Sequence, residues 1–219
     1  KLYYRELIAR FSHHLALNWN MGEENGSWGN IEGQDTEQRR EMINYFYEND
    51  PYQHHRVIHN GQWYDDLFGD KSKLTGASLQ THREDFARVH PMTLDLYFAS
   101  EEAGKPWPVA CDEPGDHRFS LVPDEINPNH DNARQNALWG NLLAGGWGVE
   151  WYFGYRHAHS DLTCEDWRSR ENMWDQSRHA LQFFENYQVP FWKMRPRDEL
   201  SGANNWILAS PDNADDFYA

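Results

Sequence analysis

Two pairs of neighbouring carboxylates, Glu23-Glu24 and Asp112-Glu113, each follow a short apolar run. The first pair comes after residues 15–20 (LALNWN) and the second comes at the end of the run that begins at 108 (PVAC). If both runs are strands of one parallel sheet, the pairs meet at its carboxyl edge, where α/β proteins place their sites. Glycosidic cleavage needs such a pair, one protonated acid for the leaving oxygen and one ionised carboxylate as nucleophile or base.

Each carboxylate pair also has a purely structural interpretation. Glu23 and Glu24 fit a solvated loop or the first turn of a helix equally well. Asp112 and Glu113 precede Pro114-Gly115, and Asp, Pro and Gly all favour turns. Aromatic neighbours can raise the pKa of a catalytic acid, while polar neighbours hold its partner ionised. The spacing alone therefore leaves catalysis and turn formation both open.

Polar and aromatic side chains follow the same predicted strands, and we expect them to line a substrate cleft. The chain has 11 Trp, 11 Tyr and 11 Phe, and aromatic rings pack well on the C–H faces of sugars as well as in ordinary cores. The candidate substrate-binding residues are Trp19, Asn20, Asn25, His59, Asn60, Trp63, Tyr64, Gln80, His82, Trp151, Tyr152 and Tyr155.

Other chemistries have weaker support. His157 and His159 have the H-x-H spacing of some metal hydrolases, but a third ligand would have to converge on them. A metal-dependent hydrolase is kept as an alternative, and no metal or cofactor is predicted. The sequence has no G-x-G-x-x-G, Walker or G-x-S-x-G motif, so nucleotide binding and an α/β-hydrolase have no support. Cys111 and Cys164 are predicted to be ordinary buried residues.

The elements that must position these residues alternate between helices and strands. Asp35 and Gln38 have the spacing of a capping box for a helix, Pro91 predicts a break within 85–100, and Thr163 with Asp166 predicts the cap of a long helix. This alternation indicates βαβ units and a parallel sheet. Predicted strands cover 15–20, 56–59, 76–80, 108–111, 149–153 and 206–209, and predicted helices cover 4–11, 36–46, 85–100, 131–143 and the region after 166.

Composition excludes several classes of protein. The formal net charge is −15, which disfavours nucleic acid and anionic membrane surfaces as partners. The mean hydropathy is −0.94, and no apolar run approaches the roughly 18 residues of a spanning helix. No linker interrupts the 219 residues, so residues 1–219 are expected to form a single domain.

Five segments together resemble a known family. They are WNMGEENG, QWYDDLFG, LTGASLQTH, PVACDEPG and LWGNLLAGGWGVEWYFGY. In this order they resemble the apiosidase-like glycoside hydrolases, secreted bacterial enzymes of the (β/α)8 TIM-barrel type. The resemblance implies a glycosidase that acts on a poly- or oligosaccharide by retaining double displacement, and it implies a secreted, periplasmic or cell-surface location.

The resemblance also implies roles for individual residues. It makes Glu24 the acid/base, with Glu23 as the rival, and Glu113 the nucleophile, with Asp112 as the rival. The rings of Trp151, Tyr152 and Tyr155 would wall the sugar subsite. His59, Asn60, Trp63, Gln80 and His82 would line it.

Matched to this family, the chain holds only strands four to eight of a barrel. Residues 1–219 are then the C-terminal portion of a catalytic domain, a partial barrel whose N-terminal half and flanking β-sandwich domains lie elsewhere. Such a portion need not be active alone. A non-catalytic carbohydrate-binding or scaffold module that uses the same aromatic residues remains the second hypothesis.

Overall fold

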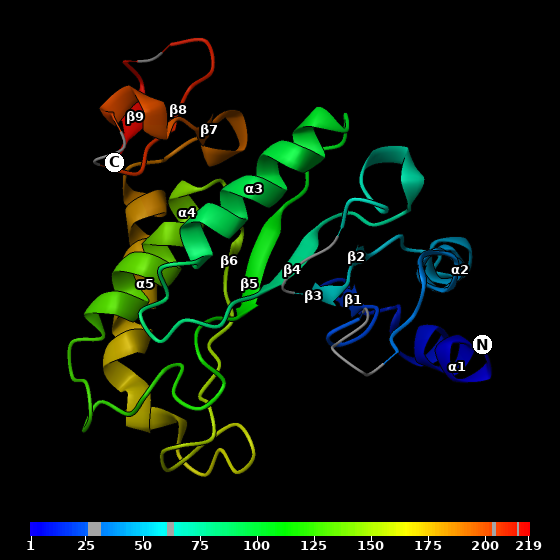
Figure 1. The fold of residues 1–219 in the computed structure, drawn as a ribbon, viewed down its shortest axis with the longest axis horizontal. Helices are drawn as coiled ribbons and strands as arrows, with labels where there is room; N and C mark the ends of the chain where they lie inside the picture. Colours follow the sequence, from blue (N-terminus) through cyan, green and yellow to red (C-terminus); the bar gives the residue numbers. More distant parts are fainter. Residues whose placement is uncertain (26–31, 61–63, 203–204, 214) are drawn as a thin grey trace.

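The computed structural model describes residues 1–25, 32–60, 64–202, 205–213 and 215–219, and Trp63 therefore lies outside the described residues. The described chain has a mixed α/β fold in which short strands alternate with helices (Figure 1). None of its helices is long and apolar enough to cross a membrane.

The first six strands run parallel and follow one another in chain order. They are β1 (Asn18–Asn20), β2 (His55–Val57), β3 (His59–Asn60), β4 (Ala77–Gln80), β5 (Val109–Glu113) and β6 (Gly148–Val149). β1 pairs with β2, and β3, β4, β5 and β6 pair in that order. The predicted parallel arrangement of the strands is thus confirmed, but these strands form two separate sheets, and the strand predicted over 56–59 is divided between them at Ile58. β6 is also shorter than predicted, because residues 150–153 leave the ladder.

In the described part of the chain, five α-helices pack around these strands. They are α1 (Leu2–Phe11), α2 (Thr36–Asn49), α3 (Val89–Glu102), α4 (Gly140–Leu143) and α5 (Glu171–Asn186). The predicted capping box begins α2: Asp35 accepts a hydrogen bond from the Gln38 backbone, and the Gln38 side chain accepts one from the Asp35 backbone. Two groups at the helix N-terminus are satisfied in this way.

Two predictions about helices and one about the burial of a cysteine are wrong. Pro91 does not break a helix, because it is the third residue of α3, where a missing N–H removes no intrahelical bond. Thr163 does not cap α5, because Asp166 caps a preceding 3₁₀ turn through the Arg168 backbone. Cys164 is exposed rather than buried, whereas Cys111 is buried as predicted.

Shorter elements connect the main ones. A π-helical segment, η2 (Ala133–Trp139), leads directly into α4, so the single helix predicted over 131–143 has two geometries. A small antiparallel sheet follows α5, and only its middle strand was predicted. It consists of β7 (Arg195–Pro196), β8 (Leu208–Ala209) and β9 (Phe217–Tyr218). The 3₁₀ turns are η1 (Gly69–Lys71), η3 (Trp167–Arg170), η4 (Phe191–Lys193) and η5 (Asp198–Ser201).

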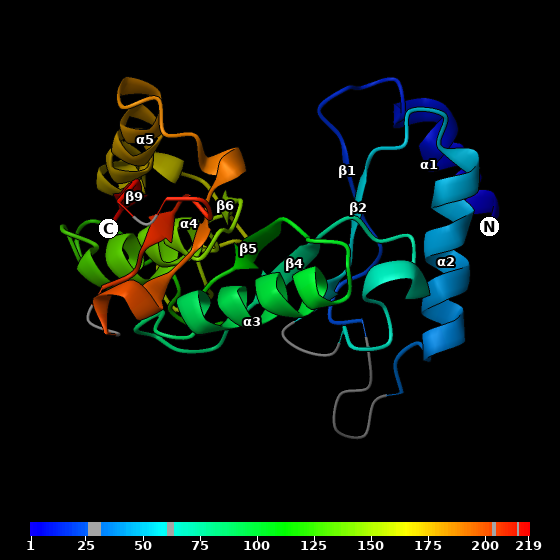
Figure 2. The same ribbon diagram turned by 90° about the horizontal axis from the view of Figure 1, so that it is seen from above.

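The molecule is elongated, with the parallel strands between two groups of helices (Figures 1 and 2). α1 and α2 lie beside β1 and β2, α3 runs along β4 and β5, and α4 and α5 lie at the opposite end with the small sheet. The core lies between the strands and these helices, where Ile43, Leu79, Val89 and Val109 are fully buried. Each such side chain contributes about 1.5–3 kcal/mol of burial.

The opposite face of the strands borders an open hollow of about 570 Å³. Val57, Ser78, Ala110 and Asp112 contribute to its lining, together with Glu150 just after β6. On β5, Ala110 and Asp112 lie two residues apart and therefore point to the same side. The lining also includes Asn18, His55 and Ala77, the first residues of β1, β2 and β4, so the hollow runs along this face of the strands and borders the polar cluster at Ser78 and Asp112.

Candidate active site

His59 is the centre of a buried polar cluster at the carboxyl ends of the strands. Its Nε2 lies 2.9 Å from Oε2 of Glu113, and its Nδ1 lies 3.0 Å from Oδ1 of Asp112. The second oxygen of Asp112 accepts a hydrogen bond from the Ser78 hydroxyl. His59 and Ser78 are register partners on β3 and β4, so their side chains share one face of the sheet.

Gln80 joins the two predicted catalytic carboxylates. Its Nε2 donates to Oε1 of Glu24 at 3.0 Å and to Oε2 of Glu113 at 3.2 Å. A bulge between Leu79 and Gln80 places Gln80 opposite Glu113 in the ladder, as bulges near active sites often re-aim a side chain. The structure therefore brings Glu24 and Glu113 together, although they are far apart in the chain.

Backbone hydrogen bonds hold the loop after β1 against β3. The backbone N–H of Met21 donates to the Val57 carbonyl, and that of His59 donates to the Gly22 carbonyl. Asn20 Oδ1 also accepts from the His59 backbone at 3.1 Å. Glu24 adopts the left-handed conformation with φ 46°, which a non-glycine residue keeps only where its surroundings hold it. The Asn20 side chain thus binds the backbone of β3.

Hydrogen bonds favour the charged forms of both Glu113 and His59. Burial opposes the charge of Glu113, but the hydrogen bonds from His59 and Gln80 outweigh it and leave the pKa of Glu113 below its usual value. Burial likewise opposes the charge of His59, yet the hydrogen bonds to Asp112 and Glu113 raise the pKa of His59 to about 10. An ionised Glu113 beside a charged His59 is therefore the state at neutral pH.

Tyr152 and Tyr155 lie beside the cluster, in the segment after β6. Their rings meet edge to face with centroids 5.8 Å apart, and Tyr155 is exposed. Burial, contact with Tyr155 and the nearby charge of Glu113 raise the pKa of Tyr152. His82 is exposed, and its charge helps to lower the pKa of Glu113. These three residues fit the predicted substrate-binding surface.

Three other predicted binding residues are directed into the core instead. The Trp19 indole donates to Asp50 at 3.0 Å and packs on Phe46. The Tyr64 hydroxyl donates to the backbone carbonyls of Ile58 and Ser78. Trp151 donates to Ser177 of α5 at 3.1 Å. The sequence does not reveal whether an aromatic residue near a strand end faces the core or the site. It therefore could not separate these three rings from Tyr152 and Tyr155.

The remaining predicted residues have varied positions. Asn25 is buried and donates to Gln34 at 2.6 Å, which fixes the same loop. Glu23 is exposed, and the Gln80 amide contacts Glu24 rather than Glu23. Asn60 belongs to β3.

Three polar residues near the site were not among the sequence candidates. Ser78 anchors Asp112 as described above. Glu150 lines the hollow, and burial followed by the charge of Asp112 raises its pKa. Asp161 accepts hydrogen bonds from the backbones of Phe153 and Gly154, which fixes the segment that carries Tyr155. Ser78 was detectable as the inward neighbour of Gln80 by strand alternation, but the role of Asp161 depends on a loop contact.

His157 and His159 do not form the start of a metal centre in the described part of the chain. His159 Nδ1 lies 3.3 Å from Glu165, and His157 packs near Phe119. Among the described residues, no three His, Cys, Asp or Glu side chains gather closely enough to hold a metal ion.

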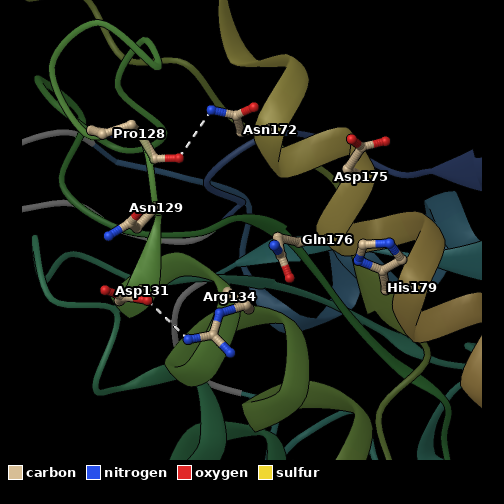
Figure 3. A pocket seen from close by; sticks show the side chains of 8 residues that line it. All are labelled: Pro128, Asn129, Asp131, Arg134, Asn172, Asp175, Gln176 and His179. Atoms are coloured by element: carbon tan, nitrogen blue, oxygen red, sulfur yellow. Dashed lines mark hydrogen bonds and ion pairs between the residues drawn. The ribbon is translucent and has the colours of Figure 1, made fainter.

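A separate polar pocket of about 450 Å³ lies between the segment 128–134 and α5 (Figure 3). Asp131 pairs with Arg134 at 2.9 Å across its edge, and Asn172 donates to the Pro128 carbonyl at 3.0 Å. Asp175 and His179, which also line it, are exposed residues of α5. Its lining comes from helical and loop segments rather than from the strand ends, so we place the candidate site at Glu24 and Glu113.

Comparison with known proteins supports the fold. No protein-family model and no curated protein matches this sequence. The fold is similar to that of a glycoside hydrolase family 5 protein from Bacteroides vulgatus ATCC 8482, with a TM-score of 0.61 and 16% sequence identity. The match covers 95% of this chain and 50% of that protein, so the chain spans about half of its length. The chain thus has an α/β fold similar to that of this glycoside hydrolase family 5 protein.

Proposed function

We propose that the chain carries the catalytic carboxylates of a retaining glycosidase, with Glu113 as nucleophile and Glu24 as acid/base. The observation that carries the proposal is the shared contact with Gln80, which brings carboxylates from two strand ends to one amide nitrogen. The fold similarity to a glycoside hydrolase family 5 protein agrees with this chemistry.

The separation of the two carboxylates favours retention of configuration. The hydrogen bonds from Gln80 Nε2 are 3.0 Å to Glu24 and 3.2 Å to Glu113. Because the two oxygens share this nitrogen, they lie closer together than the roughly 6.5 Å at which inverting pairs begin. Retaining pairs are about 5–5.5 Å apart. This short separation of the two carboxyl groups fits a retaining pair better than an inverting pair, in which a water must fit between them.

The reaction follows from the charge states. The ionised Glu113 attacks the anomeric carbon as Glu24 gives its proton to the departing glycosidic oxygen. A covalent glycosyl ester on Glu113 results. Glu24 then takes a proton from water, the water oxygen attacks the anomeric carbon, and the ester bond breaks to regenerate Glu113.

Trapping of the covalent intermediate tests the assignment. A panel of 2-deoxy-2-fluoro glycosides with dinitrophenyl leaving groups is incubated with the protein, and labelled peptides are sequenced by mass spectrometry. We expect the label on Glu113. A label on Asp112, or turnover that persists in Glu113→Gln, would overturn the assignment.

Leaving-group dependence separates Glu24 from Glu23. Glu24→Gln should lose activity on substrates with poor leaving groups but keep it on dinitrophenyl glycosides, which need no proton donor. Glu23→Gln is the matched control and should leave both activities unchanged. The reverse pattern would make Glu23 the acid/base. Saturable sugar binding with no turnover in any variant would favour the non-catalytic binding module.

We further propose that β1 to β6, with β2 and β3 counted as one interrupted strand, correspond to strands four to eight of a (β/α)8 barrel related to the apiosidase-like enzymes. The parallel order of these strands and the match to half of the neighbour's length support this correspondence. A polysaccharide or oligosaccharide substrate, and action outside the cytoplasm, belong to the same proposal. Turnover of soluble oligosaccharides, compared with that of intact polymers, tests the substrate class.

A further inference from the structure

We propose that His59 is a positioning residue, held as a charged imidazolium between Glu113 and Asp112, and that Asp112 and Ser78 anchor it. The nucleophilic role of Glu113 rests on the function proposed above. The charge state of His59 and the anchoring role of Asp112 are new statements that can be measured without any substrate.

Both ring nitrogens of His59 face carboxylate oxygens. Nδ1 lies 3.0 Å from Asp112 and Nε2 lies 2.9 Å from Glu113. Nδ1 also lies 3.3 Å from the Ser78 hydroxyl oxygen, but that hydroxyl donates its proton to Asp112. A neutral imidazole carries only one N–H, so either neutral tautomer would direct a lone pair at a carboxylate. Only the imidazolium donates to both oxygens, and the His59 side chain is buried away from competing water.

Both side-chain oxygens of Asp112 have a hydrogen-bond partner. One oxygen of Asp112 contacts His59, and the other accepts from the Ser78 hydroxyl. Among the described residues, both hydrogen bonds to Glu113 reach the same oxygen, Oε2. We therefore assign the attack on the sugar to Oε1 of Glu113, the oxygen that His59 and Gln80 do not contact, whereas the two oxygens of Asp112 contact His59 and Ser78.

Charged groups from each neighbouring strand end act on this centre. Asp112 and Glu113 come from β5, Glu150 follows β6 and adds negative charge near Asp112, and His82 follows β4 and acts on Glu113. Glu24 reaches the cluster from β1 through the Gln80 amide. The acidic groups favour a cation at His59, and the raised pKa of His59 agrees with this balance.

A fixed cation beside Glu113 gives Glu113 and Glu24 different roles. His59 stabilises the ionised form of Glu113 through a charge-assisted hydrogen bond. Glu24 receives its hydrogen bond from a neutral amide and is more exposed than Glu113. His59 keeps its own proton throughout the reaction, and it touches Glu113 rather than the sugar.

Nuclear magnetic resonance of the ¹⁵N-labelled imidazoles tests the charge state directly. The His59 resonances are assigned by their loss in His59→Gln, and the native 219-residue chain is titrated with pH. We expect both ring nitrogens of His59 to remain protonated at pH 7 and to titrate near 10. A single protonated nitrogen at pH 7, or a midpoint near 6.5, would overturn the proposal.

Asp112→Asn tests the anchor, because it removes the charge while keeping the size. We expect the His59 midpoint to fall by about one unit or more, the scale on which a nearby opposite charge acts. The matched control is Asp198→Asn, which alters another His–Asp contact, 2.6 Å long, between Asp198 and His90. The control should leave the His59 midpoint unchanged. Equal shifts in both variants, or none in Asp112→Asn, would contradict the anchoring role.

Activity and covalent labelling then separate this proposal from the glycosidase proposal. Asp112→Asn should still be labelled on Glu113, and His59→Gln should move the acid limb of kcat/KM to higher pH. Absence of labelling in the native chain, with His59 titrating near 10, would refute only the glycosidase. Normal labelling with His59 titrating near 6.5 would refute only the positioning role.

Discussion

Removal of the Gln80 amide should raise the pKa of Glu113. Gln80→Met keeps the length of the side chain but deletes the donor to Glu113 and Glu24. Hydrogen bonds to charged groups contribute about 1.5–3 kcal/mol. Because one nitrogen is shared and its bond to Glu113 is 3.2 Å long, we take the lower end of this range. That corresponds to about one pKa unit.

The sign of the effect on activity follows from the direction of the native shift. The pKa of Glu113 is lowered below 4.5, so the ionised nucleophile is present above that pKa and is lost as the pH falls through it. Without the Gln80 donor, the acid limb should move to higher pH by about one unit. Activity at neutral pH should fall by roughly tenfold if the amide also positions Glu24 against Glu113.

Two measurements check this prediction. The pH dependence of kcat/KM reports the free protein, and ¹³C resonances of the Glu113 carboxyl report its titration without turnover. Gln182→Met is the matched control, since Gln182 is exposed on α5, and it should shift neither quantity. An unchanged carboxyl titration in folded Gln80→Met, or a shift to lower pH, would refute the reasoning.

Three further predictions concern stability and binding. Asp50→Ala should cost about 3–5 kcal/mol in urea unfolding, because buried Asp50 accepts hydrogen bonds from Trp19 and His54. Gly154→Ala should cost about 1–3 kcal/mol, because Gly154 has φ +69° and a Cβ there would lie 2.6 Å from the Arg118 carbonyl oxygen. Tyr155→Ala should raise KM about fivefold without lowering kcat, from about 1 kcal/mol of lost sugar contact.

Each of these three predictions has a matched control variant. Asp175→Ala removes an exposed pair with Arg178 and should cost under about 1 kcal/mol. Gly104→Ala has a similar φ of +79°, but the described residues leave open space around its Cβ, so it should cost less than Gly154→Ala. Tyr155→Phe should keep the native KM. Equal effects within any of these pairs would contradict the contact invoked for it.

Asp50 also gives a pH dependence of stability. Burial opposes its charge, but hydrogen bonds from His54 and Trp19 outweigh burial and lower its pKa below 3.8. Its contribution is therefore complete above the unfolded pKa and is lost as the pH falls through the lower, folded value. We expect the native urea midpoint to fall in this range, and Asp50→Asn to reduce the fall. An identical acid profile in both proteins would show that Asp50 is not responsible.

Local sequence patterns determined the elements and their ends with fair success. Asp35 and Gln38 form the predicted capping box because both groups of the box lie within one turn. Glu24 follows β1 as predicted, whereas β5 extends beyond the predicted strand and ends at Glu113. Apolar runs bounded by turn residues define strands over a few neighbours, so their existence is better predicted than their ends. Pro91 was misjudged because its effect depends on its distance from the helix start, which the sequence places only approximately.

Tertiary structure alone decided which side chains face the site. Trp19 lies within β1, and Tyr64 follows β3 as Tyr152 follows β6, yet the polar atoms of Trp19 and Tyr64 bind Asp50 and backbone carbonyls in the core. The contacts of His59 join residues 53 and 54 positions apart, and strand register brings them together. Sequence thus specified the residue types and the local elements, whereas the packing of distant strands specified the charge of His59 and its place beside Glu113.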